Sequence, residues 1–250
     1  MRIKKIAAVL AVLGLILSLA GCGTSFRGGI GAVMGDGVIT DTIVPLDGSF
    51  DRIVSQGSFD VIISNEPSDS LLFQLDENLM TYVDLNVRIS GSTLYLSTQN
   101  ITQSISPTVF RFHVGTTGLH AVNLTGSGSI RGDGILRADH FEAGVTGSGD
   151  VNLEVDIAGD LNAAVGGSGE LVLRGSAAYV NISVSGSGTA DLREVPVQNA
   201  EVRVTGSGDA HVRAAEDLRA TVAGSGDIFY HGAPANVTRS VTGSGSISGR

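Results

Sequence analysis

Acidic residues follow several copies of a repeated Gly-Ser-Gly tripeptide, and regularly spaced carboxylates are candidate ligands for a cation. Asp150, Glu170, Asp209 and Asp227 each stand one residue after such a tripeptide. If equivalent residues lie side by side, Asp150 falls beside Glu170 and Asp209 beside Asp227, and each pair of like charges repels. A divalent cation such as Ca²⁺ would relieve the repulsion by bridging each pair. The alternative, which we favour, is that these carboxylates point into water and that the chain binds no cofactor.

Histidines near the same carboxylates raise the question of acid–base catalysis. His211, Tyr230 and His231 stand within a few residues of Asp209 or Asp227, and a polysaccharide-active enzyme can combine such groups. The intervals between tripeptides vary only from 18 to 21 residues, which leaves little chain for the loops of a catalytic cleft. We therefore assign no catalytic residue and predict that the protein is not an enzyme, with a polysaccharide-active β-helix enzyme as an alternative.

The single cysteine, Cys22, ends a segment that is typical of a bacterial lipoprotein signal. Three basic residues within the first five positions precede an uncharged run from Ile6 to Leu19, which is too short to span a bilayer but suits a signal peptide. The sequence Leu-Ala-Gly-Cys then matches a lipobox, in which the cysteine receives a diacylglycerol. We predict a signal peptide over residues 1–21, lipidated Cys22 as a membrane anchor, and a flexible tether over residues 22–40.

The charge and the residue after the cysteine limit the partners and the location. A formal net charge of −9 gives the chain no basic face for nucleic acid. Gly23 rather than an aspartate follows Cys22. We therefore expect a lipid-anchored protein of the bacterial cell envelope, in the outer membrane or at the cell surface rather than the inner membrane.

The Gly-Ser-Gly tripeptides recur with a period near 20 residues, which is the mark of stacked supersecondary units. They begin at Gly126, Gly147, Gly167, Gly186, Gly206, Gly224 and Gly243. Apolar residues alternate with polar ones on both sides of each tripeptide, as in β-strands with one buried face. The sequence thus predicts an all-β fold, a parallel β-helix (β-solenoid) of coils of about 20 residues over residues 116–250, which we expect to be right-handed.

Residues 41–115 are rich in predicted strands but irregular, and we expect them to cap the N-terminal end of the solenoid. We expect the chain to turn at each Gly-Ser-Gly tripeptide, which we call a corner. Gly57-Ser58-Phe59 resembles a degenerate copy of such a corner. Residues 76–84 are expected to form one helical turn capped by Asp76, and residues 87–96 a hairpin.

Three features taken together resemble a known family. A lipobox is followed by FDRIVSQGSFDVII at residues 50–63, by LDENLMTYVDLNVRISGSTLYL at residues 75–96, and by serial TGSGD corners. This order is similar to that of the head GIN domain lipoproteins, which are named as autotransporter-type adhesins. The resemblance covers residues 43–250 and implies a β-helical fold and a cell-envelope location, with no catalytic residues to transfer.

We predict a non-enzymatic, adhesin-like lipoprotein that presents repetitive faces to a polysaccharide, an envelope protein or another cell. Outward residues of one type before the corners, such as Thr125, Thr146 and Thr205, would suit a repetitive ligand, although no ligand-binding residue is assigned. The alternative is a structural protein that forms a homo-oligomer through the open end of its coil stack, because an unpaired strand edge can pair with another chain.

Overall fold

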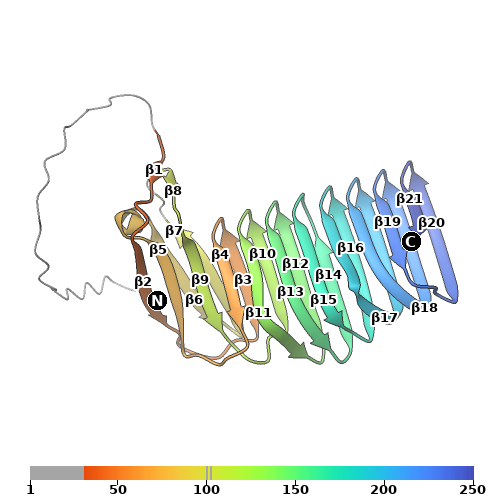
Figure 1. Cartoon of the computed structure of the whole chain (residues 1–250), viewed down its shortest axis with the longest axis horizontal. Coiled ribbons are helices and arrows are strands. Elements are labelled where there is room, and N and C mark those ends of the chain that lie inside the picture. The colour runs from red at the N-terminus through yellow and green to blue at the C-terminus, as the bar shows by residue number, and fades with distance from the viewer. Residues whose placement is uncertain (1–30, 100, 102) are drawn as a thin grey trace, which may run out of the picture. The chain divides into compact units, whose positions relative to one another are not determined.

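The computed structural model describes residues 31–99, 101 and 103–250, so the predicted signal peptide and Cys22 lie outside the described residues. Residues 32–250 form one compact unit of stacked parallel coils with a single short helix, η1 (Glu77–Tyr82). The predicted all-β solenoid is thus confirmed (Figure 1). Within the described ranges, no helix is long and apolar enough to cross a membrane.

Each coil has one strand that leads into a corner and one that leaves it, and together these strands form two faces of a continuous 19-stranded sheet. The pre-corner face consists, in spatial order, of β6 (Asp84–Ser90), β7 (Thr93–Gln99), β3 (Arg52–Gly57), β10 (Ala121–Gly126), β12 (Phe141–Gly147), β14 (Asp160–Val165), β16 (Tyr179–Gly186), the ends of β17 (Thr189–Gly206) and β18 (Asp209–Gly224), and β20 (Asn236–Gly243).

The post-corner face consists, in the same direction, of β2 (Ile39–Pro45), β5 (Ser70–Asp76), β9 (Phe110–Gly115), β4 (Asp60–Ser64), β11 (Ser129–Ala138), β13 (Asp150–Ile157), β15 (Glu170–Ser176), the beginnings of β17 and β18, β19 (Asp227–His231) and β21 (Ser246–Gly249). Alternate side chains of both faces point inward and meet in one apolar core. In β13, for example, Val151, Leu153 and Val155 are buried while the residues between them are exposed.

Neighbouring coils approach most closely at the corners. The carbonyl oxygen of Gly147 accepts hydrogen bonds from the N–H groups of Ser168, at 2.8 Å, and Gly169, at 3.0 Å, and the other corners repeat this arrangement. The first glycine of a corner commonly has a positive φ, 131° at Gly147, which residues with a Cβ rarely adopt. The last glycine has a different reason: a Cβ at Gly169 would overlap the carbonyl oxygen of Gly149 in the coil before it.

The coils do not stack in the order of the chain. The coil of β3 and β4 pairs in parallel with β10 and β11 on one side, where Gly57 is in register with Gly126. On its other side it pairs with β7 and β9, which come later in the sequence. Parallel stacking therefore already includes residues 52–64 and does not begin at the predicted boundary, residue 116.

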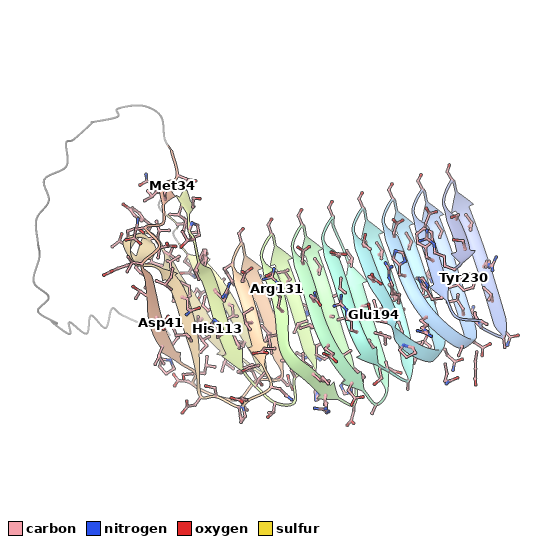
Figure 2. The ribbon with its side chains drawn as sticks, in the orientation of Figure 1. Met34, Asp41, His113, Arg131, Glu194 and Tyr230 are labelled. Carbon is pink, nitrogen blue, oxygen red and sulfur yellow. The ribbon has the colours of Figure 1, made fainter. Side chains whose placement is uncertain are left out.

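Antiparallel strands close the N-terminal end of the stack. β5 pairs with β9, β2 with β5, and β6 with β7, all antiparallel. Gln74 of β5 links the two strands beside it: its Nε2 donates to Asp41 Oδ1 at 2.9 Å, and its Oε1 lies 3.0 Å from His113 Nε2. Asp41 and His113 are labelled at this end of the stack in Figure 2. This cap covers the strand edge that a parallel solenoid would otherwise expose.

Part of the segment predicted to be a tether belongs to the folded unit. β1 (Val33–Met34) pairs with β8 (Ile105–Ser106) in a separate two-stranded parallel sheet, and Val33 packs against the core. The predicted tether over residues 22–40 therefore extends too far, because β1 and the start of β2 already have partners in the fold.

Asp76 is fully buried at the start of η1, but its side chain does not cap that helix. Its carboxylate instead accepts four hydrogen bonds: from the N–H groups of Gly37, Thr108 and Val109 and from the hydroxyl of Thr108, at 2.6–3.3 Å. Burial alone would raise the pKa of Asp76, but these hydrogen bonds lower it to about 2. Asp76 thus stands at the predicted N-cap position, but its side chain does not cap the helix, because these other groups donate to its carboxylate oxygens.

The crowding at the last glycine of a corner can be tested within one coil. We expect Gly169→Ala to lower the free energy of unfolding by about 1–3 kcal/mol, as overpacking does. Gly166→Ala is the matched control, because its Cβ would lie 3.7 Å or more from its nearest neighbours and its φ is ordinary. Urea unfolding measures both variants. Equal stability of the two variants would contradict the claim that the close approach of neighbouring coils at Gly169 excludes a Cβ.

The hydrogen bonds of ionised Asp76 predict that the stability of the fold depends on pH. Because the pKa in the folded state lies below the unfolded value near 4, ionised Asp76 stabilises the fold above about pH 4, and this contribution is lost as the pH falls toward about 2. We expect Asp76→Asn to destabilise the protein by about 2 kcal/mol at neutral pH, and by progressively less in acid.

Urea unfolding across this pH range is the measurement for Asp76, and Asp47→Asn, which removes an exposed carboxylate, is the control. A loss of stability in Asp76→Asn that does not change with pH would contradict the claim that the ionised form of Asp76 stabilises the fold.

Candidate functional site

The residues one position after each corner form a ladder on the post-corner face. As predicted, Asp150 is in register with Glu170, and Asp209 with Asp227. Asp209 Oδ1 accepts a hydrogen bond of 3.1 Å from the N–H of Asp227, while Asp227 Oδ1 accepts bonds of 2.7 Å from the N–H and the hydroxyl of Ser246. At least one oxygen of each of these two aspartates therefore binds the next coil.

A cation site at these carboxylates stays a prediction. Among the described residues, no three His, Cys, Asp or Glu side chains are grouped so that they could hold a metal ion. A bridging Ca²⁺ would thus have to take most of its ligands from water, since Ca²⁺ binds six to eight oxygens.

His211 is almost fully buried on the same face, but it does not pair with Asp209 or Asp227. Its neighbours across the sheet are Asp191 and Phe229, and its ring stacks on that of Phe229 at 4.9 Å. Burial lowers the pKa of His211, and the nearby positive charge of Arg193 lowers it further. A neutral imidazole stacked on a phenyl ring fits a structural role better than acid–base catalysis.

The remaining residues of this region also lie against other side chains, although His211 Nδ1 and His231 Nε2 have no hydrogen-bond partner among the described residues. Arg239 lies over the ring of Tyr230, and the ring of His231 is 6.1 Å from that of His211. Burial alone would raise the pKa of Asp191, but hydrogen bonds from Arg193 lower it, and their ion pair measures 2.8 Å. Sequence inspection missed Asp191, although it occupies the same outward position of its coil as His211.

The threonines before the corners form only part of a ladder. Thr125 and Thr146 are neighbours in register, and Thr205 pairs with Ser185. Gly166 and Ala223 occupy the same position in two other coils and interrupt the row of hydroxyl groups. The array of identical residues expected from the sequence is therefore discontinuous.

The pre-corner face contains two hollows that the sequence analysis did not predict. The first, which we call the asparagine hollow, has a volume of about 200 Å³ and is lined by Asn123, Glu142, Gly144, Asn162, Ala164 and Asn181, among others. It forms because Gly144 and Ala164 are small where neighbouring coils have larger outward side chains. Asn181 Nδ2 donates to Asn162 Oδ1 at 3.3 Å, so the amides form a short ladder along the floor.

The second, the tyrosine hollow, has a volume of about 510 Å³ and lies over β16, β17, β18 and β20. Its lining includes Tyr179, Asn199, Glu201, Asp217, Arg219 and Asn236. These residues stand five or seven positions before the first glycine of their corners, so they come from four coils and are about 20 residues apart in the sequence. Comparing outward positions coil by coil is the signal that would have revealed them.

Comparison with known proteins identifies relatives of the whole folded unit. The model of a family described as "Putative auto-transporter adhesin, head GIN domain" matches residues 49–234. No curated protein shows a significant match.

Solved structures share the architecture. A "putative adhesin" from Bacteroides fragilis is 20% identical with a TM-score of 0.77, and the match covers 88% of this chain and 100% of that one. A "putative lipid binding protein" from Parabacteroides distasonis is 26% identical with a TM-score of 0.70 and the same coverage. A "putative adhesin" from Parabacteroides merdae is 22% identical with a TM-score of 0.69, over 88% of this chain and 99% of that one.

Proposed function

Because the chain belongs to the head GIN domain family, we propose that it is a non-enzymatic, adhesin-like binding module of the bacterial cell envelope whose pre-corner face carries the binding site. The observation that supports this proposal most directly is the pair of hollows on one face of a solenoid. Concave, partly polar surfaces are where proteins bind ligands. On the opposite face, Asp209 and Asp227 accept hydrogen bonds from the next coil, and His211 stacks on Phe229.

We further propose that lipidated Cys22 anchors this module to the outer membrane or the cell surface. From Cys22 to Val33 the chain can extend by at most about 40 Å, so the cap would lie near the bilayer and the coils would project from it. The relative described as a "putative lipid binding protein" is compatible with a membrane-associated role, although here the acyl chains would supply the membrane contact.

The anchor can be tested by fractionation of cells that express the full chain. We expect the wild type in the membrane fraction and Cys22→Ser in the soluble fraction, because a single thiol accepts the diacylglycerol. Retention of Cys22→Ser on membranes with an unchanged mass would contradict the proposed anchor.

The binding face can be tested with residues 32–250, which contain all the strands and the core of the part of the chain that the structure describes. We expect this segment to bind at least one component of an array of envelope glycans, envelope proteins and intact bacterial cells. Ala164→Arg, which fills the asparagine hollow, should weaken that binding by about tenfold or more, the effect of losing one good contact region. Val172→Arg adds the same side chain to the post-corner face of the same coil and should change little.

Repeating the array with a chelator tests the cation prediction at the same time. Binding that is insensitive to chelator supports the proposed face without calcium, whereas binding that chelator abolishes would assign the site to Asp150, Glu170, Asp209 and Asp227. Equal effects of Ala164→Arg and Val172→Arg, or no binding to any component, would refute the proposed binding face.

A further inference from the structure

The tyrosine hollow combines an aromatic ring with polar side chains, one of which has an atom without a hydrogen-bond partner among the described residues. It rests on the pre-corner strands of the last four coils, and its largest side chain is Tyr179, which is half-buried at the start of β16. Asn199 lies beside Tyr179 in register, and Asp217 lies beside Asn199. One aromatic ring, one amide and one carboxylate therefore follow each other along the axis at the strand spacing, about 4.8 Å.

Tyr179 lines the hollow, and its ring differs from those of two other tyrosines in what lies over it. Two other tyrosines carry an arginine over the ring: Arg88 lies 4.1 Å from the centre of Tyr95, and Arg239 lies 5.1 Å from that of Tyr230. In the part of the chain that the structure describes, no cation lies over Tyr179. Burial, followed by the charges of Glu201 and Asp160, raises the pKa of Tyr179, so its hydroxyl stays neutral and can both donate and accept a hydrogen bond.

Asn199 lines the hollow and has one acceptor without a partner in the described part of the chain. Its Oδ1 is buried and has no hydrogen-bond partner among the described residues, which is a costly state for an amide. The next outward pair along the axis is already satisfied, because Asn236 Nδ2 donates to Asp217 Oδ1 at 2.8 Å. A ligand that supplies a hydroxyl donor would relieve Asn199 once its amide turns toward the hollow, because Oδ1 itself is buried. The other lone pairs of Asp217 would accept a second hydroxyl group.

These groups specify the chemistry of the occupant. A sugar ring has an apolar C–H face that packs on an aromatic ring, and hydroxyl groups around its rim that both donate and accept hydrogen bonds. Glu201 and Arg219, which also line the hollow, are a carboxylate and a guanidinium that can each contact two neighbouring hydroxyl groups. A polyanion is disfavoured, because the chain carries a net charge of −9.

We propose that the tyrosine hollow is a subsite for one neutral sugar unit of a polysaccharide, with the ring packed on Tyr179 and a hydroxyl group donating to Asn199. The asparagine hollow lies on the same face, and Asn181, which lines it, is in register with Glu201 of the tyrosine hollow. A polysaccharide laid along the axis would therefore pass over both hollows. This inference rests on the proposed binding function of the pre-corner face and names its ligand.

The experiment uses residues 32–250 in affinity gel electrophoresis through soluble neutral polysaccharides, namely dextran, mannan, xylan and laminarin, with polygalacturonate as the acidic counterpart. We expect at least one neutral polysaccharide to retard the protein. Tyr179→Ala should weaken that binding by about tenfold or more, whereas Tyr179→Phe, which keeps the ring, should retain most of it. Tyr95→Ala is the matched control, since Tyr95 is an outward tyrosine of the same sheet whose ring Arg88 already covers.

The outcomes separate this inference from the proposed function. Retardation by a neutral polysaccharide that Tyr179→Ala removes and Tyr95→Ala does not supports both. Binding to envelope proteins that is sensitive to Ala164→Arg, without retardation by any neutral polysaccharide, would keep the proposed function and overturn the sugar subsite. Equal effects of Tyr179→Ala and Tyr95→Ala, or retardation by polygalacturonate alone, would also overturn it. Circular dichroism of each variant distinguishes loss of the site from loss of the fold.

Discussion

The close approach of backbones at the corners is the constraint on which the rest of the structure depends. One glycine carbonyl, such as that of Gly147, accepts two N–H groups from the next coil, and a Cβ on the last glycine of that coil would overlap the coil before it. Every coil must therefore make the same turn at the same place, and the inward residues on either side are fixed in register. Valines two residues before successive corners, Val165, Val184 and Val204, accordingly stack in one buried ladder.

This constraint separates the residues that build the fold from those that are free to vary. Inward positions are mostly Val, Ile, Leu, Ala and Phe, while outward positions range from Gly144 to Arg219 without changing the backbone. A hollow on the surface then needs no long loop. It needs only small or well-placed side chains at equivalent positions of neighbouring coils, as at Ala164 or Tyr179. A surface of this kind suits recognition of an extended ligand better than enclosure of a small one.

The features that the sequence predicts are those determined within one coil or by the regular repetition of coils. The Gly-Ser-Gly corners, the alternating strands and the lateral pairing of Asp150 with Glu170 follow from the period and are present in the structure. The hairpin of β6 and β7 also follows from a local pattern, the alternating residues around Ser90 and Gly91.

Features that depend on contacts between distant segments are not predictable in this way. The insertion of the β3–β4 coil between β7–β9 and β10–β11 depends on pairings that no local pattern specifies. Asp76 has the sequence context of a helix cap, yet its carboxylate accepts a hydrogen bond from the hydroxyl of Thr108, which lies 32 residues away. The tyrosine hollow draws its residues from four coils, so no continuous motif marks it.

Hydroxyl-radical footprinting with a bound neutral polysaccharide tests the central claim most directly, because the four tyrosines of the chain report on separate regions. Tyr179 lies in the proposed subsite, Tyr230 follows the corner of a later coil, Tyr95 lies near the cap, and Tyr82 ends η1. The account predicts that the polysaccharide slows the oxidation of Tyr179 and leaves the other three unchanged. Protection of Tyr230 without protection of Tyr179 would place the ligand at the C-terminal end of the stack, where Tyr230 packs against the core, and contradict the account.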